Sequence, residues 1–151
     1  MIERVLDLVT EQTRDNQPAL ADFAARCEPF ANELFDALDK VYHQVVVVPT
    51  PAPVALAETL RAFFGELKQT NLRAAYAAFG EWSASAVRAR LPYDVALRLV
   101  RESQRALLPF VLRAYGNEPP LPLTLDAVAD AFDAIVAVIG AAYGNGLPAR
   151  F

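Results

Sequence analysis

The stretch LDAVADAFDAIVAVIGAAY, from Leu125 to Tyr143, decides the fold class of this chain. Its larger apolar residues recur every three or four positions, which indicates an α-helix. After Asp133 every residue through Tyr143 is apolar or glycine, and a helix that is apolar on all sides is buried on all sides. This run is far shorter than the roughly 20 residues that span a membrane. The stretch therefore predicts a buried helix of an all-α protein.

Two locations would bury this helix. It lies either in the centre of the domain or with one face against a second subunit, where small residues such as Ala137 and Gly140 would allow a close approach. Both locations stay open on the sequence alone. The second predicts a homodimer, and the residues predicted at its interface are Ile135, Val138, Ile139 and Ala142.

Helical spacing continues on the N-terminal side of this stretch. It predicts a helix from Pro92 to about Tyr115, because the residue before a proline disfavours helical geometry and Gly116 is a good helix stop. The last helix is expected to start near Thr124, which is a plausible cap. The apolar stripe predicted for the preceding helix is Tyr93, Leu97, Val100, Leu107, Leu108 and Val111.

Four more helices are expected in residues 1–91. A first pattern from Ile2 is interrupted at Asn16 and Pro18, and a second pattern follows, in which Pro29 either kinks the helix or splits it in two. A third pattern starts near Pro53. The segment 69–71 either forms a corner before the fourth helix or continues the third.

The segment VYHQVVVVPTPAP, residues 41–53, holds the only strand candidate, at 45–48. A lone short strand has no partner here, so we interpret it as a helix end or an extended linker. The three prolines that follow force a turn into the next helix. Residues 1–151 are therefore predicted to form one all-α domain of about six helices. Their unequal lengths and proline bends favour a globin-like arrangement.

Composition excludes several classes of protein. The 151 residues carry 14 basic and 18 acidic side chains, a net charge of −4, and no basic block, which argues against a nucleic-acid surface. The single cysteine, Cys27, permits no internal disulfide and suggests a cytoplasmic protein. The acidic start of the chain does not resemble a signal peptide. No membrane association is expected.

Residues with catalytic chemistry are sparse. His43 is the only histidine; it is either a ligand or base, or a histidine at a helix C-terminus, where the dipole favours a cation, and we favour the second interpretation. Cys27 lies on an apolar stripe and is interpreted as a small core residue. A structural zinc site needs about four Cys or His ligands. We therefore predict no metal, no cofactor and no enzymatic activity.

An aromatic stripe, Tyr76, Phe79 and Trp82, has two interpretations. Most such stripes belong to the core, and a minority line an apolar ligand pocket. Buried Tyr and Trp also need a partner for their polar atoms. We predict a pocket formed by these three residues with Tyr42 and His43.

Two stretches resemble the N-terminal domains of bacterial stressosome sensors of the RsbR type. One is LPYDVALRLVRESQRALLPFVLRAYG (Leu91 to Gly116), which is similar to the proline-initiated, Arg-rich long helix of that family. The other is LTLDAVADAFDAIVAVIGAAYGNGL (Leu123 to Leu147), which is similar to its closing helix. Together they cover the C-terminal third to half of the chain.

The resemblance implies a dimeric, non-haem globin-like fold that acts as the sensory input of a regulatory protein. In that family the partners are STAS-domain proteins. A haem globin needs a proximal histidine in its second half, and no histidine follows His43. The expected function is a non-catalytic sensory domain that works through dimerisation and shifts in helix packing. The alternative is a small-molecule-binding helical domain with an aromatic pocket.

Overall fold

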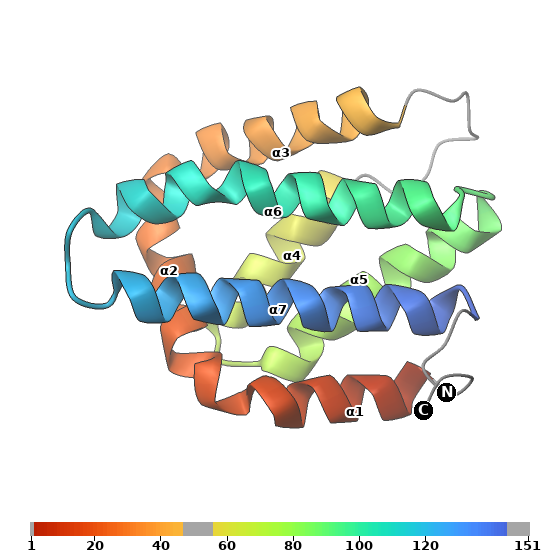
Figure 1. The fold of residues 1–151 in the computed structure, drawn as a ribbon, viewed down its shortest axis with the longest axis horizontal. Helices are drawn as coiled ribbons and strands as arrows, with labels where there is room; N and C mark the ends of the chain where they lie inside the picture. Colours follow the sequence, from red (N-terminus) through yellow and green to blue (C-terminus); the bar gives the residue numbers. More distant parts are fainter. Residues whose placement is uncertain (1, 47–55, 145–151) are drawn as a thin grey trace.

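The computed structural model describes residues 2–46 and 56–144 and confirms that the fold is all-α (Figure 1). Helix accounts for 89% of these residues, and they contain no strand. None of the helices in these two ranges is long and apolar enough to cross a membrane. The α-helices are α1 (Ile2–Thr13), α2 (Gln17–Cys27), α3 (Ala31–Val45), α4 (Leu56–Lys68), α5 (Leu72–Arg88), α6 (Tyr93–Tyr115) and α7 (Leu121–Ala142).

Helices α3, α6, α7 and α1 form a layer in that order, as Figure 1 shows. Helices α4 and α5 cross behind this layer, and α2 closes one end. Helix α7 packs against α6, α5, α1 and α2, so it lies at the centre of the protein. These contacts explain why the run after Asp133 is wholly apolar, while Asp126, Asp130 and Asp133 lie on the one exposed side of the helix.

The central position of α7 corrects the predicted dimer interface. Ile135, Val138 and Ile139 are completely buried within the chain, with no exposed surface for a second copy. Ala142 is half-buried. Of the two locations open to this helix, the centre of the domain is therefore the one the structure shows. An apolar stripe looks the same in either case, which is why the spacing of the residues could not decide between them.

The breaks in the N-terminal half follow the predicted signals. A short 3-10 turn, η1 (Arg14–Asn16), separates α1 from α2, with Pro18 in the first turn of α2. Pro29 lies in a second 3-10 turn, η2 (Glu28–Phe30), and splits the predicted second helix into α2 and α3. This split gives seven α-helices in the described residues, where about six were predicted.

The corner between α4 and α5 is real. Thr70 has a φ of 58°, which no α-helix accommodates, and the side chain of Asn71 accepts a hydrogen bond from the Ala74 N–H at 3.4 Å. A continuous helix through this segment is therefore wrong. At the other end of α4, the predicted start at Pro53 and the proline-rich turn before it lie outside the described residues.

Two predictions for the C-terminal helices need correction. Leu108 is not on the buried stripe of α6, because 45% of its surface is exposed. Thr124 does not cap α7: the helix starts at Leu121, with Pro122 in its first turn, and Thr124 is a buried residue inside it. Proline is readily accommodated in a first turn, where no N–H partner is available. The predicted limits of α6, including its end before Gly116, are confirmed.

Two glycines should respond to alanine substitution in opposite directions. Gly116 has φ 56° and ψ −121°, a conformation that strains any residue with a Cβ, so Gly116→Ala should cost about 1–3 kcal/mol of unfolding free energy. Gly65 lies inside α4 with no atom within 4 Å of an added Cβ, so Gly65→Ala should stabilise by about 0.5–1 kcal/mol. Urea denaturation of both variants tests this; two changes of the same sign would contradict it.

Candidate functional site

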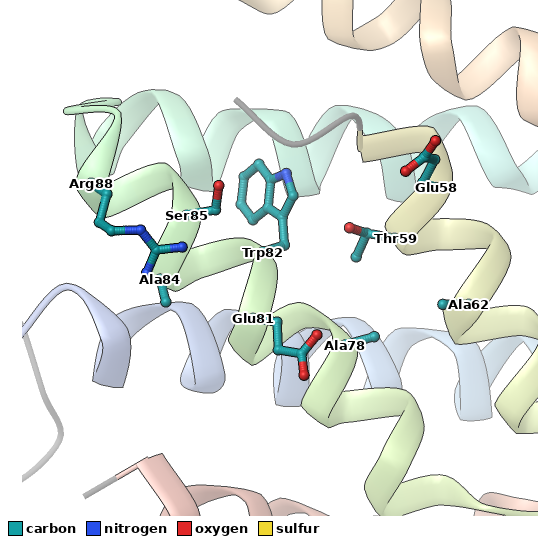
Figure 2. Close-up of a pocket in the computed structure, with 9 residues that line it drawn as sticks. All are labelled: Glu58, Thr59, Ala62, Ala78, Glu81, Trp82, Ala84, Ser85 and Arg88. Atoms are coloured by element: carbon teal, nitrogen blue, oxygen red, sulfur yellow. The ribbon is translucent and has the colours of Figure 1, made fainter. Parts of the chain in front are cut away.

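A hollow of about 490 Å³ lies between α4 and α5 and is open to solvent. Figure 2 shows its walls: the N-terminal half of α4 on one side and the C-terminal half of α5 on the other, with the Trp82 ring between them. This volume is within the usual range for small-molecule sites, about 300–1,000 Å³. The lining residues are Glu58, Thr59, Ala62, Ala78, Glu81, Trp82, Ala84, Ser85 and Arg88.

The hollow lies beside an aromatic contact that joins α4 to α5. Near their connecting corner, Phe63 of α4 packs edge-on against Phe79 of α5, with 5.2 Å between ring centroids, and also contacts Tyr76 at 6.3 Å. Beside this aromatic contact, three of the side chains that line the hollow are small: Ala62 on α4 and Ala78 and Ala84 on α5. Side chains of this size cannot fill the space between diverging helices (Figure 2).

Trp82 gives the hollow an unusual chemical property. The residue is 1% exposed, and its indole N–H finds no hydrogen-bond acceptor among the described residues. Less than 1 Å² of the nitrogen is exposed, so water does not replace the missing partner. In Figure 2 the nitrogen is on the ring edge turned toward α4. A buried donor left unpaired costs about 1–3 kcal/mol.

Three charged residues surround the hollow. Glu58 and Glu81 stand on opposite walls, and Arg88 lies in the last turn of α5 (Figure 2). Within residues 2–46 and 56–144 none of the three forms an ion pair, whereas Arg26, Arg73 and five other Lys and Arg side chains do. The hollow is therefore surrounded by charged groups of both signs, while its interior is largely apolar.

Tyr76 and Phe79 do not line this hollow, which corrects part of the predicted pocket. Both are core residues, at 0% and 2% exposure. The Tyr76 hydroxyl lies 2.7 Å from Thr13 Oγ1, and Thr13 in turn donates to the Val9 carbonyl at 2.7 Å. Burial raises the pKa of Tyr76 to about 12. Its polar atom is therefore satisfied by a structural bond between α5 and α1.

Tyr42 and His43 also lie away from the hollow. The His43 side chain is 71% exposed, and its Nε2 lies 3.5 Å from Asp39 Oδ2, one turn earlier on α3. This agrees with the interpretation of a histidine in the last helical turn. Tyr42 points its hydroxyl inward, where it has no partner among the described residues, and burial raises its pKa. Trp82 is the only predicted pocket residue that lines the hollow.

Cys27 behaves as the sequence suggests. It is 3% exposed, and burial raises the pKa of its thiol to about 12, so the thiol stays protonated and unreactive at neutral pH. In the described ranges, no group of three His, Cys, Asp or Glu side chains is arranged to hold a metal ion.

The chain was compared with family models, curated proteins and solved structures, and none of the three comparisons finds a match.

Most of the residues lining the hollow were missed at the level of sequence. Thr59 is buried and Ser85 half-buried, and both put a hydroxyl on the wall. Exposed alanines such as Ala62 carry no periodic signal, because alanine is common on every face of a helix. The shared feature, small residues facing each other across α4 and α5, becomes visible only when the two helices are placed together.

Proposed function

We propose that this protein is a non-catalytic sensory domain that binds a small, largely apolar molecule in the hollow between α4 and α5. The observation that carries this proposal is the buried indole N–H of Trp82, which has no acceptor among residues 2–46 and 56–144 and belongs to a ring that lines the hollow. A ligand with an apolar body and a carbonyl or similar acceptor supplies what this donor lacks. The hydroxyls of Thr59 and Ser85 offer further hydrogen bonds.

Binding in this way requires a change in packing. Because the Trp82 nitrogen is buried, an acceptor reaches it only if the ring turns or α4 moves away from α5. A hydrogen bond between the ligand and the Trp82 N–H then stabilises the arrangement in which the ring has turned or α4 has moved away. A ligand that interacts better with one of two arrangements shifts the population toward it, which is the basis of a sensory response.

The last turns of α5 connect the hollow to the end of α7. Ser85 and Arg88 line the hollow, and the chain then turns at Arg90, which has a φ of 61°, before α6. The Leu91 carbonyl in this corner accepts a hydrogen bond of 2.8 Å from the Tyr143 hydroxyl. The Tyr93 and Tyr143 rings lie 5.2 Å apart. A shift of α5 therefore acts directly on the C-terminal end of α7.

The family resemblance supports the same role. Stressosome sensors of the RsbR type use a non-haem globin-like domain as sensory input, and the resembling stretches here are the regions of α6 and α7. On this proposal the fold is globin-like, the protein is cytoplasmic, and the regulatory partners are STAS-domain proteins. The helical content and the central α7 are compatible with that assignment.

Compounds that pair with the Trp82 N–H should stabilise the protein. We expect aryl-free cyclic ketones and amides to raise the melting temperature and shift Trp82 fluorescence, and the matching hydrocarbons to do so less. Trp82 is the only tryptophan, so the emission reports this site alone. The proposal fails if no compound of such a library moves either signal.

A matched pair of variants locates the effect. Ala62→Leu fills the hollow, whereas Ala25→Leu adds the same side chain to an exposed position of α2 outside it. Ala62→Leu should remove the response to the ketones, and Ala25→Leu should keep it. Equal responses in the two variants would show that the compounds bind elsewhere.

A further inference from the structure

A smaller hollow, of about 220 Å³, lies on the side of α4 that faces α2 and α3. Its apolar lining comes from all three helices: Ala24 and Cys27 of α2, Leu34 and Phe35 of α3, and Phe64 of α4. Three exposed residues of α4 stand at its opening, and these are Arg61, Gly65 and Lys68. The hollow therefore combines an apolar interior with a basic edge.

Two phenylalanine rings form a corner in the wall of this hollow. Phe35 and Phe64 have ring centroids 5.8 Å apart and ring planes 78° apart. Next to them, a Cβ added at Gly65 would meet no atom within 4 Å, so the space beside the corner is open. Aromatic rings pack edge-on or offset-stacked at centroid distances of about 4.5–7 Å, so the corner suits a third ring.

Arg61 differs from the other arginines that stack on aromatic rings. The described residues contain three such stacks: Arg26 on Tyr115, Arg113 on Phe30, and Arg61 on Phe35, the last with 4.4 Å from the guanidinium carbon to the ring centroid. Arg26 and Arg113 also pair with a carboxylate, that of Glu118 and that of Glu33. All 18 acidic side chains of the sequence lie within residues 2–46 and 56–144, and none of them pairs with Arg61.

A ligand carboxylate supplies what Arg61 lacks. Its stack on Phe35 occupies one face of the guanidinium plane, and the N–H groups along the edge of that plane are suited to two parallel bonds with a carboxylate. Lys68 does not have this role, because it is already paired with Glu28 within the chain. Arg61 is therefore the cation of this hollow that selects an anion.

We propose that this hollow is a second ligand site, which binds a compact aromatic monocarboxylate. The ring of the ligand packs in the corner of Phe35 and Phe64, and its carboxylate pairs with Arg61. The volume of about 220 Å³ is below the usual range of small-molecule sites, about 300–1,000 Å³. A single ring with one carboxylate fits this space, and a long acyl chain does not.

This site goes beyond the proposed function and has a different chemistry. The hollow beside Trp82 offers a buried N–H to a neutral acceptor, whereas this one offers a cation to an anion. The two hollows have no lining residue in common, and α4 is the only helix that contributes to both. Either site can therefore fail in experiment without the other.

Calorimetric titration of the full chain with sodium benzoate, up to about 10 mM at constant ionic strength, tests the proposal; ligands of this size bind in the micromolar to millimolar range. Benzoate should bind saturably at one site. Benzamide has the same shape without the charge and should bind about tenfold more weakly, because it loses the charged hydrogen bonds. An absence of saturable benzoate binding, or equal affinities for the two compounds, would overturn the site.

Substitutions of Arg61 test the role of its guanidinium group. Arg61→Gln should raise the dissociation constant of benzoate by about tenfold. Arg61→Lys should lie between this variant and the wild type, because it keeps the charge and loses the planar fork. The side chain is exposed, so both variants should fold. Wild-type affinity in Arg61→Gln would contradict the proposed pairing.

Two leucine substitutions on α4 separate this site from the hollow beside Trp82. Gly65→Leu fills the smaller hollow and should abolish benzoate binding while the response to cyclic ketones stays. Ala62→Leu should do the reverse. Both positions are exposed, and leucine favours a helix more than glycine does, so both variants should fold. Benzoate binding that persists in Gly65→Leu, or is lost in Ala62→Leu, would overturn the assignment of benzoate to the smaller hollow.

Discussion

Replacing Ile135 with alanine should lower the free energy of unfolding by about 2–5 kcal/mol. The side chain is completely buried at the centre of the helix that four others cover. Its removal loses the transfer free energy of the deleted methyl groups and leaves a cavity that the surrounding helices fill only in part. Urea denaturation monitored by circular dichroism measures the change.

The same variant separates an internal role for Ile135 from a role at an interface. As a core residue, Ile135→Ala should leave the dissociation constant of any dimer unchanged. Leu123→Ala, at the exposed start of the same helix, should change the stability of the folded subunit by no more than about 0.5 kcal/mol. A weakened dimer with normal subunit stability in Ile135→Ala would contradict the central position of α7.

Phe63→Ala should have the second large effect, a loss of about 3–5 kcal/mol. Phe63 is 2% exposed and contacts Phe64, Tyr76 and Phe79, with ring centroids 5.2 to 6.3 Å away. These contacts hold α4 to α5 below the hollow. Truncation therefore removes a large buried ring and loosens the joint between the two helices. Thermal and urea unfolding give the magnitude.

Phe110→Ala is the matched control for this change. Phe110 stacks on Phe30 at 5.9 Å but is only half-buried, at the edge between α3 and α6. Its truncation should cost clearly less than that of Phe63, because the free energy follows the apolar area removed from water. Equal losses of unfolding free energy in the two variants would mean that the aromatic cluster between α4 and α5 stabilises the protein no more than the half-buried Phe110 does.

Much of the fold could be predicted from local signals. Leu91-Pro92 and Gly116 mark the two ends of α6, Pro29 marks the division between α2 and α3, and Asn71 caps α5. In each case the cause is a property of one residue: a missing N–H, a tolerance for unusual φ, or a side-chain acceptor. Such signals do not depend on what the helix packs against.

Local signals failed where tertiary contact decides. Leu108 fits an apolar stripe by spacing, yet it lies on the same line as Arg101 and Arg105 and is exposed with them. Threonine is a common N-cap residue, but α7 begins earlier, at Leu121, with Pro122 in its first turn. Tyr76 and Trp82 belong to one stripe, and both face α4, but Tyr76 packs against the Phe63 ring and bonds to Thr13, whereas Trp82 lies beside the hollow.

The most direct test of the proposed site is the indole N–H resonance of Trp82. One tryptophan gives one such signal in a ¹H–¹⁵N spectrum, and without ligand its N–H has no acceptor in the described part of the protein. On titration with a stabilising ketone the proton signal should move downfield and its exchange with solvent should slow, as expected for a newly formed hydrogen bond. An unchanged indole resonance at saturating ketone would contradict the account.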